Sequence, residues 1–340
     1  MQPFVFERAD SPDAALRAAT APRAASSALS NPTQYLAGGT TLLDLMKLEV
    51  MRPRTVVDIN GLADGALGRI EPRRDGVRLG ALVRMADAAD DPTIRRQCPM
   101  IAQSLALAAS QQIRNMASLG GNVLQRTRCA YFRDVSYAAC NKRVPGTGCA
   151  AMNGINREHA VLGTSDQCIA TYPGDFAQAL IALDAGVEIA GTDGSRTIRF
   201  AALHRPPGDT PDIETTLRPG EMIAGFDVPL APWMRRSLYL KVRDRASYEF
   251  AVASAALALD IRDGTVADAR IALGGVATVP WRARAAEQAL RGQAIDDATI
   301  AAAADSAFAQ ARGREHNSFK IALGRRTLAR ALRQAAAIEI

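Results

Sequence analysis

Four of the five cysteines in the chain lie within forty residues of one another, and four thiolates can bind a metal ion or an iron–sulfur cluster. They are Cys129, Cys140, Cys149 and Cys168. Basic residues outnumber acidic ones in this segment, and surplus positive charge suits a bound group that is net negative. The basic residues are Arg126, Arg128, Arg133, Lys142, Arg143 and Arg157, against Asp134, Glu158 and Asp166.

The spacing of these cysteines favours a [4Fe–4S] cluster bound by all four. Ten, eight and eighteen residues separate them, whereas a structural zinc site usually contains a pair with about two to four intervening residues. The intervening residues include Pro145, Gly146, Gly148 and Gly154. This composition suits an irregular loop that wraps around a cube-shaped ligand. A zinc site, two disulfides and inert buried thiols remain open alternatives. Cys98 stands apart and is interpreted as a small buried residue.

Two glycine pairs are candidates for binding a phosphate group. Ala37-Gly38-Gly39-Thr40-Thr41-Leu42 lies between an expected strand and an expected helix. Its glycines let backbone amides approach a ligand, and Thr40 or Thr41 can cap a helix whose free N–H groups attract an anion. Ser118-Leu119-Gly120-Gly121-Asn122 again combines glycines, a hydroxyl and an amide. Neither matches the Rossmann or P-loop motif. We expect the two loops to hold the ends of one extended dinucleotide, with two unrelated turns as an equally open alternative.

The elements around the first loop indicate an α/β unit. Residues 1–60 predict a strand at 4–6, a helix that opens at Ser11-Pro12, a strand before the glycines, a helix at 42–50 and a strand at 55–59. Residues 61–230 predict a strand at 77–79, helices within 92–110, a helix at 173–184, strands at 187–190 and 196–200, and a long loop at 205–219.

The last third of the chain has a different order of elements. Residues 231–340 predict strands at 237–243, 249–259 and 266–273, then helices at 281–291, 297–311 and 317–337. Strands followed by helices favour a small α+β domain, here with a three-stranded sheet covered by a helical layer.

Composition and charge exclude several other classes of protein. The chain has 340 residues, of which 48% are hydrophobic and 22% charged, as in an ordinary globular protein. The net charge of +6 is scattered and aromatic residues are only 5%, which argues against nucleic-acid binding. No apolar run reaches the ~20 residues that cross a bilayer. The N-terminal residues lack a secretory signal, so we expect assembly in the cytoplasm, and periplasmic export only with a signal-bearing partner.

Four stretches carry a family resemblance: AGGTTLLDLMKLE (37–49), IRNMASLGGN (113–122), YPGDFAQALIALDA (172–185) and LKVRDRASYEFA (240–251). They resemble the FAD-binding, medium subunits of the molybdenum hydroxylases, the group of xanthine dehydrogenase, carbon monoxide dehydrogenase and aldehyde oxidase. The segment NVLQRTRC…CNKRVPGTGC…INREHAVLGTSDQC resembles the [4Fe–4S]-containing FAD subunit of bacterial periplasmic aldehyde oxidase. Most members of the family lack these cysteines, and 4-hydroxybenzoyl-CoA reductase, with a related insertion, is the nearest alternative.

The resemblance implies a PCMH-type, CO dehydrogenase flavoprotein-like fold and the boundaries of its domains. The FAD-binding unit would have two subdomains, 1–60 and 61–230, and the second would carry the four-cysteine loop at about 124–170. A C-terminal CO dehydrogenase flavoprotein-like α+β domain would follow at 231–340.

The resemblance also implies which residues bind cofactors. The first loop would cradle the FAD pyrophosphate with Leu36, Ala37, Gly38, Gly39, Thr40, Thr41, Leu42 and Leu43. Beside the ribityl chain and flavin would lie Ser118, Gly121 and Asn122. Asp175 would hold a polar group of the cofactor, Lys241 would lie near the flavin, and Ile223 would pack nearby. Without the resemblance, Lys241 is interpreted as a surface lysine. The ligands of the cluster would be Cys129, Cys140, Cys149 and Cys168.

By resemblance, the chain is an electron-transfer subunit of a heterotrimeric molybdenum-containing aldehyde oxidase or dehydrogenase. A large partner would hold the molybdenum cofactor, and a small partner would pass electrons through [2Fe–2S] clusters to FAD and on to a small-molecule acceptor. No Ser–His–Asp or paired-carboxylate pattern is evident, so no catalytic residue is expected. Open alternatives are a xanthine dehydrogenase-like or 4-hydroxybenzoyl-CoA reductase-like complex, a stand-alone flavin oxidoreductase, and a cysteine-stapled interaction module.

Two histidines lie near these motifs. His159 sits between the cysteines, where a surface histidine is favoured over one that tunes or shields the cluster. His204 precedes Arg205-Pro206 and gives no catalytic signal.

Overall fold

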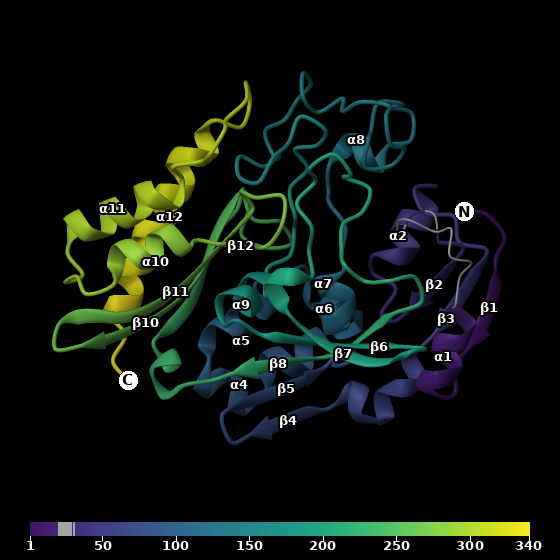
Figure 1. Cartoon of the computed structure of the whole chain (residues 1–340), viewed down its shortest axis with the longest axis horizontal. Helices are drawn as coiled ribbons and strands as arrows, with labels where there is room; N and C mark the ends of the chain where they lie inside the picture. Colours follow the sequence, from purple (N-terminus) through teal and green to yellow (C-terminus); the bar gives the residue numbers. More distant parts are fainter. Residues whose placement is uncertain (20–28, 30) are drawn as a thin grey trace.

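Three sheets divide the chain in the computed structural model, which describes residues 1–19, 29 and 31–340. They lie within residues 5–58, 70–229 and 237–282, so the domain limits expected at residues 60 and 230 fall between them. Figure 1 shows the first sheet beside the N-terminus, the second at the centre, and the third under the C-terminal helices. Within the described residues, no helix is long and apolar enough to cross a membrane.

The first sheet is a small parallel one that sets the position of the first glycine loop. Its strands are β1 (Val5–Arg8), β2 (Thr33–Leu36) and β3 (Thr55–Asp58), in the order β1-β3-β2. Two helices accompany it, α1 (Pro12–Ala19) and α2 (Leu42–Lys47). The glycine loop therefore leaves the carboxyl end of β2, the edge at which open α/β sheets commonly bind ligands. Helix α2 ends earlier than expected, and Glu49 just beyond it has a left-handed φ of 59°.

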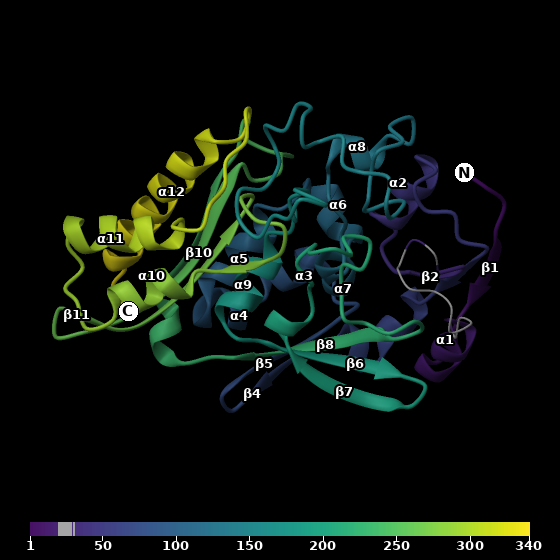
Figure 2. The same ribbon diagram turned by 45° about the horizontal axis from the view of Figure 1, so that its top comes forward.

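The second sheet is antiparallel. Its strands are β4 (Ile70–Arg73), β5 (Gly76–Gly80), β6 (Gly186–Gly191), β7 (Gly194–Arg199) and β8 (Met222–Pro229), in the order β4-β5-β8-β6-β7. The helices of this part are α3 (Met85–Asp90), α4 (Pro92–Gln97), α5 (Pro99–Ala106), α6 (Gln111–Met116), α7 (Leu119–Val123), α8 (Ala130–Arg133) and α9 (Phe176–Ala182). Figure 2 shows most of these helices on one face of the sheet, with α8 apart from them beside α2.

The third sheet has one strand more than the three expected. The strands are β9 (Ser237–Val242), β10 (Ala253–Arg262), β11 (Thr265–Gly274) and β12 (Trp281–Arg282), in the order β12-β11-β10-β9. The helices are α10 (Arg284–Leu290), α11 (Asp297–Ala307) and α12 (Phe319–Ala336). Strand β12 has only two residues, too few for a visible alternation, and it pairs with Ala272 and Leu273. Because these residues join the sheet, α10 begins at Arg284 rather than at 281.

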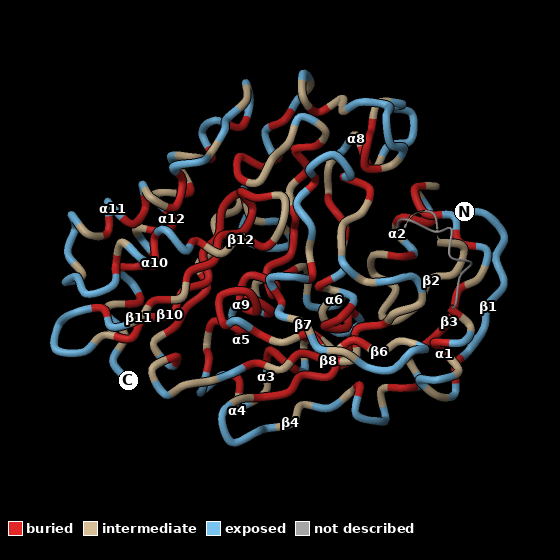
Figure 3. The backbone as a smooth tube through the Cα atoms, viewed as in Figure 1, coloured by how far each residue is buried: buried red, intermediate tan, exposed pale blue. Residues whose placement is uncertain are grey.

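Strand β10 shows why the C-terminal part packs closely on the rest. Its residues alternate between two cores, with Leu257 and Leu259 facing helices α10 to α12, and Ala256 and Ala258 facing the core that contains α5 and α9. Small side chains on the second face let those helices approach the sheet. Figure 3 shows the buried backbone concentrated where these layers meet, and the exposed backbone in the outer loops and turns. The structure confirms the expected mixed α/β class and the sheet-plus-helix C-terminal part.

Candidate functional site

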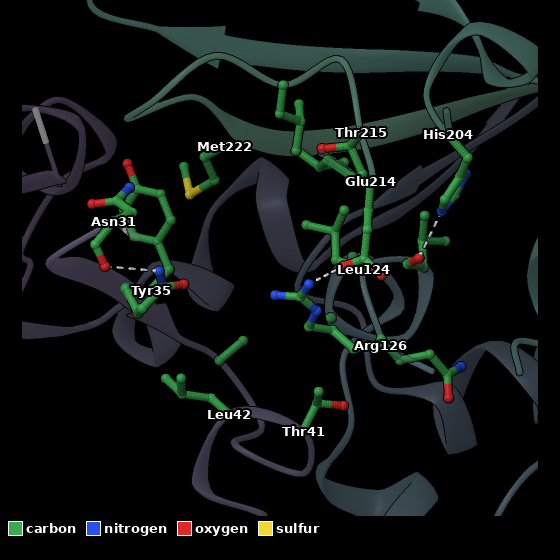
Figure 4. A pocket seen from close by; sticks show the side chains of 18 of the residues that line it. Asn31, Tyr35, Thr41, Leu42, Leu124, Arg126, His204, Glu214, Thr215 and Met222 are labelled. Carbon is green, nitrogen blue, oxygen red and sulfur yellow. Dashed lines mark hydrogen bonds and ion pairs between the residues drawn. The ribbon is translucent and has the colours of Figure 1, made fainter. Parts of the chain in front are cut away.

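A cavity of about 330 Å³ lies where the two glycine loops meet. The residues predicted as cofactor ligands that line it are Ala37, Gly38, Gly39, Thr40, Thr41, Leu42, Ser118, Gly121 and Ile223. In Figure 4, Arg126 and Glu214 point toward each other on one side of the cavity, and Asn31 and Tyr35 lie on the opposite side. The two loops, 80 residues apart in sequence, thus share one binding space.

The first loop requires glycine at both positions. A Cβ on Gly38 would collide with the carbonyl oxygen of Met116 and lie 2.7 Å from its carbonyl carbon, so the backbones of the two loop regions are in direct contact. Gly39 has a φ of +72°, which side chains rarely adopt. Thr41 occupies the N-cap of α2 but makes no side-chain cap hydrogen bond. Of the two threonines that the sequence offers as caps, Thr40 and Thr41, Thr41 therefore makes no cap, and it lines the cavity instead.

Asn60 and Arg84 join the two loops, and sequence reasoning missed both. Asn60 Nδ2 donates to Leu36 O at 3.3 Å and to Ala37 O at 2.9 Å. Arg84 Nη2 donates to Asn60 Oδ1 at 2.9 Å, and its Nη1 donates to Met116 O at 2.6 Å. These bonds hold the first loop against the residue that precedes the second. No spacing in the sequence signals this link, because the partners come from separate elements.

The second loop is the start of a short helix rather than an open turn. Ser118 is the N-cap of α7, and its Oγ accepts a hydrogen bond from Gly121 N at 3.2 Å. Gly120 N donates to Ala81 O at 2.8 Å, which fixes the loop to the end of β5. Asn122 does not line the cavity, but its Oδ1 is buried without a hydrogen-bond partner, next to Gly121 and Val123, which do. A buried acceptor without a partner is costly unless a ligand satisfies it.

Three charged side chains, Arg126, Lys142 and Glu214, line the cavity and interact with one another. Glu214 Oε2 lies 2.5 Å from Arg126 Nη2, and Glu214 Oε1 accepts from Lys142 Nζ at 2.9 Å. Burial alone would raise the pKa of Glu214, but the two cations hold it below its ordinary value. The Nε and Nη1 groups of Arg126 are buried without a hydrogen-bond partner. Glu214 comes from the expected loop 205–219, and no local pattern identified it as a site residue.

His204 also lines this cavity. Burial lowers its pKa to about 4, so the imidazole is neutral near pH 7. Its Nε2 lies 3.1 Å from Val123 O and must donate, since a carbonyl only accepts. The histidine therefore fixes the end of α7.

Asp175 and Lys241 pair with each other outside the cavity lining. Lys241 Nζ donates to Asp175 Oδ2 at 2.7 Å and to Leu107 O at 3.1 Å, and Asp175 Oδ1 accepts from Tyr239 Oη at 2.6 Å. The Lys241 side chain is only 1% exposed, so the surface-lysine alternative is wrong. Helix α9 begins at Phe176 and not at 173, and Asp175 bonds across to β9 without capping the helix. Leu36 and Leu43 also lie outside the lining, on either side of Gly39.

Replacing Lys241 with methionine is expected to lower the apparent Tm by roughly 5–10 °C, because it leaves Asp175 buried without its cation, at a cost of about 3–5 kcal/mol. The measurement is thermal unfolding followed by circular dichroism. The control is Arg333→Met, which breaks an ion pair whose side chains are 56% and 84% exposed and should leave Tm nearly unchanged. If Tm fell equally in both variants, the buried ion pair would stabilise the protein no more than the exposed one, and the prediction would be wrong.

The four clustered cysteines line a second, smaller cavity. Cys129, Cys140, Cys149 and Cys168 all contribute to its wall. All four are free thiols, and an isolated β-bridge pairs Cys140 with Cys149. Within the described part of the chain, no three His, Cys, Asp or Glu side chains are arranged to hold a single metal ion. Burial raises the pKa of Cys129 to about 12 and that of Cys168 to about 11, so these thiols need a cation beside them to ionise at neutral pH.

The two cavities share part of their walls. Lys142, Cys168 and Ala170 line both. The cysteine segment also packs on the helix that follows the first glycine loop, since Phe132 and Cys140 belong to the same hydrophobic core as Leu45. The two candidate sites are therefore neighbours.

Carboxylates from outside the segment neutralise much of its positive charge. Arg133 makes two hydrogen bonds to Asp44 of α2, at 2.6 and 3.0 Å, and Arg128 lies 3.3 Å from the same carboxylate. Arg157 pairs with Asp244 at 2.8 Å. The surplus charge inferred from the local sequence is thus largely balanced in the fold, and these ion pairs attach the segment to its surroundings.

His159 is buried, contrary to the surface position expected for it. It is 5% exposed, and its Nε2 lies 3.1 Å from Cys129 Sγ. Burial, with a contribution from the charge of Lys320, lowers its pKa to about 4.

Comparison with known proteins gives two matching family models. The model described as the FAD binding domain in molybdopterin dehydrogenase matches residues 4–231. The model described as the CO dehydrogenase flavoprotein C-terminal domain matches residues 238–335. Together they cover nearly the whole chain.

Individual relatives match over most of their length. The aldehyde oxidoreductase FAD-binding subunit PaoB of Escherichia coli (strain K12) is 45% identical over 340 residues, 99% of each chain. The glyceraldehyde dehydrogenase medium chain of Sulfolobus acidocaldarius is 25% identical over 265 residues, 78% of this chain and 75% of that one. Among solved structures, a carbon monoxide dehydrogenase from Hydrogenophaga pseudoflava that lacks the Mo-pyranopterin moiety matches with a TM-score of 0.74 and 26% identity, over 99% of both chains.

Proposed function

Because the chain belongs to the family of FAD-binding medium subunits of the molybdenum hydroxylases, we propose that it is the FAD- and [4Fe–4S]-binding electron-transfer subunit of a molybdenum-containing aldehyde oxidoreductase. The observation that carries the proposal is the 45% identity, over 99% of both chains, to a relative named as an aldehyde oxidoreductase FAD-binding subunit. The carbon monoxide dehydrogenase and xanthine dehydrogenase relatives match at lower identity, 25–26%.

The chemistry of the large cavity suits FAD. Glycine backbone approaches the space from two sides, and the buried Asn122 Oδ1 and Arg126 Nε and Nη1 at its edge have no protein partner. In this proposal the loop from Leu36 to Leu43 holds the pyrophosphate on its amides. Ser118, Gly121 and Asn122 lie along the ribityl chain and flavin. Bound FAD would collect electrons and deliver them to a terminal acceptor.

Three further residues would support the FAD site. Ile223 would pack against the cofactor, since it lines the cavity from β8. Asp175 and Lys241 do not line the cavity, so we expect them to support residues that do. One of these is Tyr172, three residues before Asp175, which lines the cavity and donates from its hydroxyl to Val123 O at 2.8 Å. The buried ion pair between Asp175 and Lys241 would keep the start of α9 in contact with β9, behind the residues that line the cavity.

The donor set of the small cavity suits an iron–sulfur cluster. Four free thiols from one segment face a common space, and each would bind a different iron atom, so no single-ion geometry is needed. The space is about 10 Å³, so the thiols must separate on loading. Because burial raises the pKa of Cys129, Cys140 and Cys168, loading would release their protons. The cluster would supply one-electron chemistry beside the FAD cavity.

The proposal includes partner subunits. Several relatives are named as medium chains or subunits, which implies larger and smaller companions. We expect a large subunit with the molybdenum cofactor and a small one with [2Fe–2S] clusters. Assembly would occur in the cytoplasm, and any export would depend on the signal of a partner.

The test is anaerobic purification of the native complex, followed by visible spectroscopy and flavin, iron and sulfide analysis. We expect flavin, iron and acid-labile sulfide in this chain and co-purification of two partners. Aldehyde turnover by the chain alone would instead favour a stand-alone flavin oxidoreductase. A colourless preparation without flavin would contradict the proposal and favour an interaction module.

A further inference from the structure

The side chain of His159 is directed at one of the four cysteine sulfurs. Its Nε2 lies 3.1 Å from Cys129 Sγ, within the range of a hydrogen bond to sulfur. In the described part of the chain, it is the one side chain that makes such a contact with any of the four. Backbone N–H groups also donate to these sulfurs, among them Ala170 N, which lies 3.4 Å from Cys168 Sγ.

The direction of this hydrogen bond follows from the chemistry of a bound thiolate. A cysteine that binds metal has lost its proton and can only accept. With a cluster bound to Cys129, Nε2 would therefore carry the hydrogen. The other ring nitrogen, Nδ1, is buried without a hydrogen-bond partner, and it would be the unprotonated nitrogen of the neutral ring.

The C-terminal helix holds His159 in place. The carbonyl oxygen of His159 accepts from Lys320 Nζ at 3.2 Å and from Asn317 Nδ2 at 3.4 Å. Lys320, at the start of α12, also donates to Glu158 O at 3.0 Å and Gly275 O at 2.8 Å. On the other side, the ring of Tyr131 lies 6.2 Å from the imidazole, centroid to centroid. The backbone of the histidine is thus anchored to a different part of the fold from the cysteines.

We propose that His159 is a positioning residue that raises the reduction potential of the cluster by donating a hydrogen bond from Nε2 to the sulfur of Cys129. The proposal rests on the cluster proposed above. Reduction adds an electron whose charge spreads onto the cysteine sulfurs, so a donor at one sulfur stabilises the reduced form more than the oxidised form. Removing the donor should therefore make the cluster harder to reduce.

The test is a redox titration of the anaerobically purified complex, in which electron paramagnetic resonance follows the signal of the reduced [4Fe–4S] cluster, a signal that comes only from chains in which the cluster is assembled. His159→Leu should shift the midpoint potential to a more negative value. His159→Gln, whose amide can donate from a similar position, should restore much of the shift. The matched control is His316→Leu, because His316 is exposed in the neighbouring segment and uses only its backbone N–H, to Asn156 Oδ1.

The outcomes separate this inference from the proposed function. A wild-type complex without a [4Fe–4S] signal overturns the proposed cluster and this inference with it. A wild-type cluster whose potential is unchanged in His159→Leu overturns only the role of His159. Equal shifts in His159→Leu, His159→Gln and His316→Leu also overturn that role, because they would reflect a general disturbance.

Discussion

Replacing Gly38 with alanine is expected to weaken FAD binding about 100-fold, which corresponds to about 2.7 kcal/mol. The added methyl group would occupy the space of the Met116 carbonyl and lie 2.9 Å from Ala117 Cα. All the obstructing atoms are backbone, so no side chain can rotate away, and the two glycine loops must move apart. Because both loops line the same cavity, the change acts directly on the proposed FAD site. The measurement is FAD titration of the flavin-free protein by calorimetry.

The matched control for this prediction is Gly61→Ala. Gly61 lies in a short 3₁₀ helix (Asn60–Asp64) after β3, where an added Cβ meets nothing within 4 Å, and it does not line the cavity. This variant should bind FAD like the wild type. If both variants bound FAD with equal affinity, the close contact at Gly38 would be irrelevant to the cofactor, and the glycine-loop site would have to be abandoned.

Replacing Cys140 with serine is expected to remove most of the iron, from about four atoms per chain toward none, while FAD remains bound. Cys140 faces the cysteine cavity and does not line the FAD cavity. A serine hydroxyl is a poor ligand for iron compared with a thiolate, which leaves the cluster one ligand short. Iron, acid-labile sulfide and flavin analysis of anaerobically purified protein measure the result. The double variant Cys140→Ser/Cys149→Ser should eliminate any residual three-iron species.

The control for iron loss is Cys98→Ser. Cys98 lies in the core of the second part of the chain, where burial raises its pKa to about 12, and its Sγ is 3.9 Å from the hydroxyl of Ser237. A serine there can bond to that hydroxyl, so the protein should fold and keep its iron. Full iron in the Cys140 variant, or equal loss in both, would show that the clustered cysteines are not the ligands.

The cysteine segment contacts the elements that form the large cavity, so the proposed iron and flavin sites are neighbours. Arg133 and Phe132 attach the cysteine segment to α2, the helix that begins at the first glycine loop. The same segment supplies Arg126 and Lys142, which line the large cavity, the proposed FAD site, together with Glu214. The cysteine segment therefore contributes to the FAD cavity even before any cluster is considered.

Local patterns were enough to predict most elements of the fold. The β-branched residues of 55–59 predicted β3, and the long helical pattern near the C-terminus predicted α12. Glycines 38 and 39 were proposed as a phosphate-binding loop because glycines between a strand and a helix let backbone amides approach a ligand, with a plain turn as the open alternative. The two-residue strand β12 and the short helix α7 were missed, since segments this short carry no period of their own.

The sequence by itself determined the elements, the two glycine loops and the four clustered cysteines, because each depends on residues that are close together along the chain. Only the tertiary structure brought Glu214 to Arg126, Asn60 to Arg84 and His159 to Cys129. It also turned Lys241 from an apparent surface residue into the buried partner of Asp175. The members of each pair are far apart in the sequence and come together only when the chain folds. Burying a polar side chain is unfavourable unless it finds a hydrogen-bond or ion-pair partner, and no local pattern in the sequence identifies that partner.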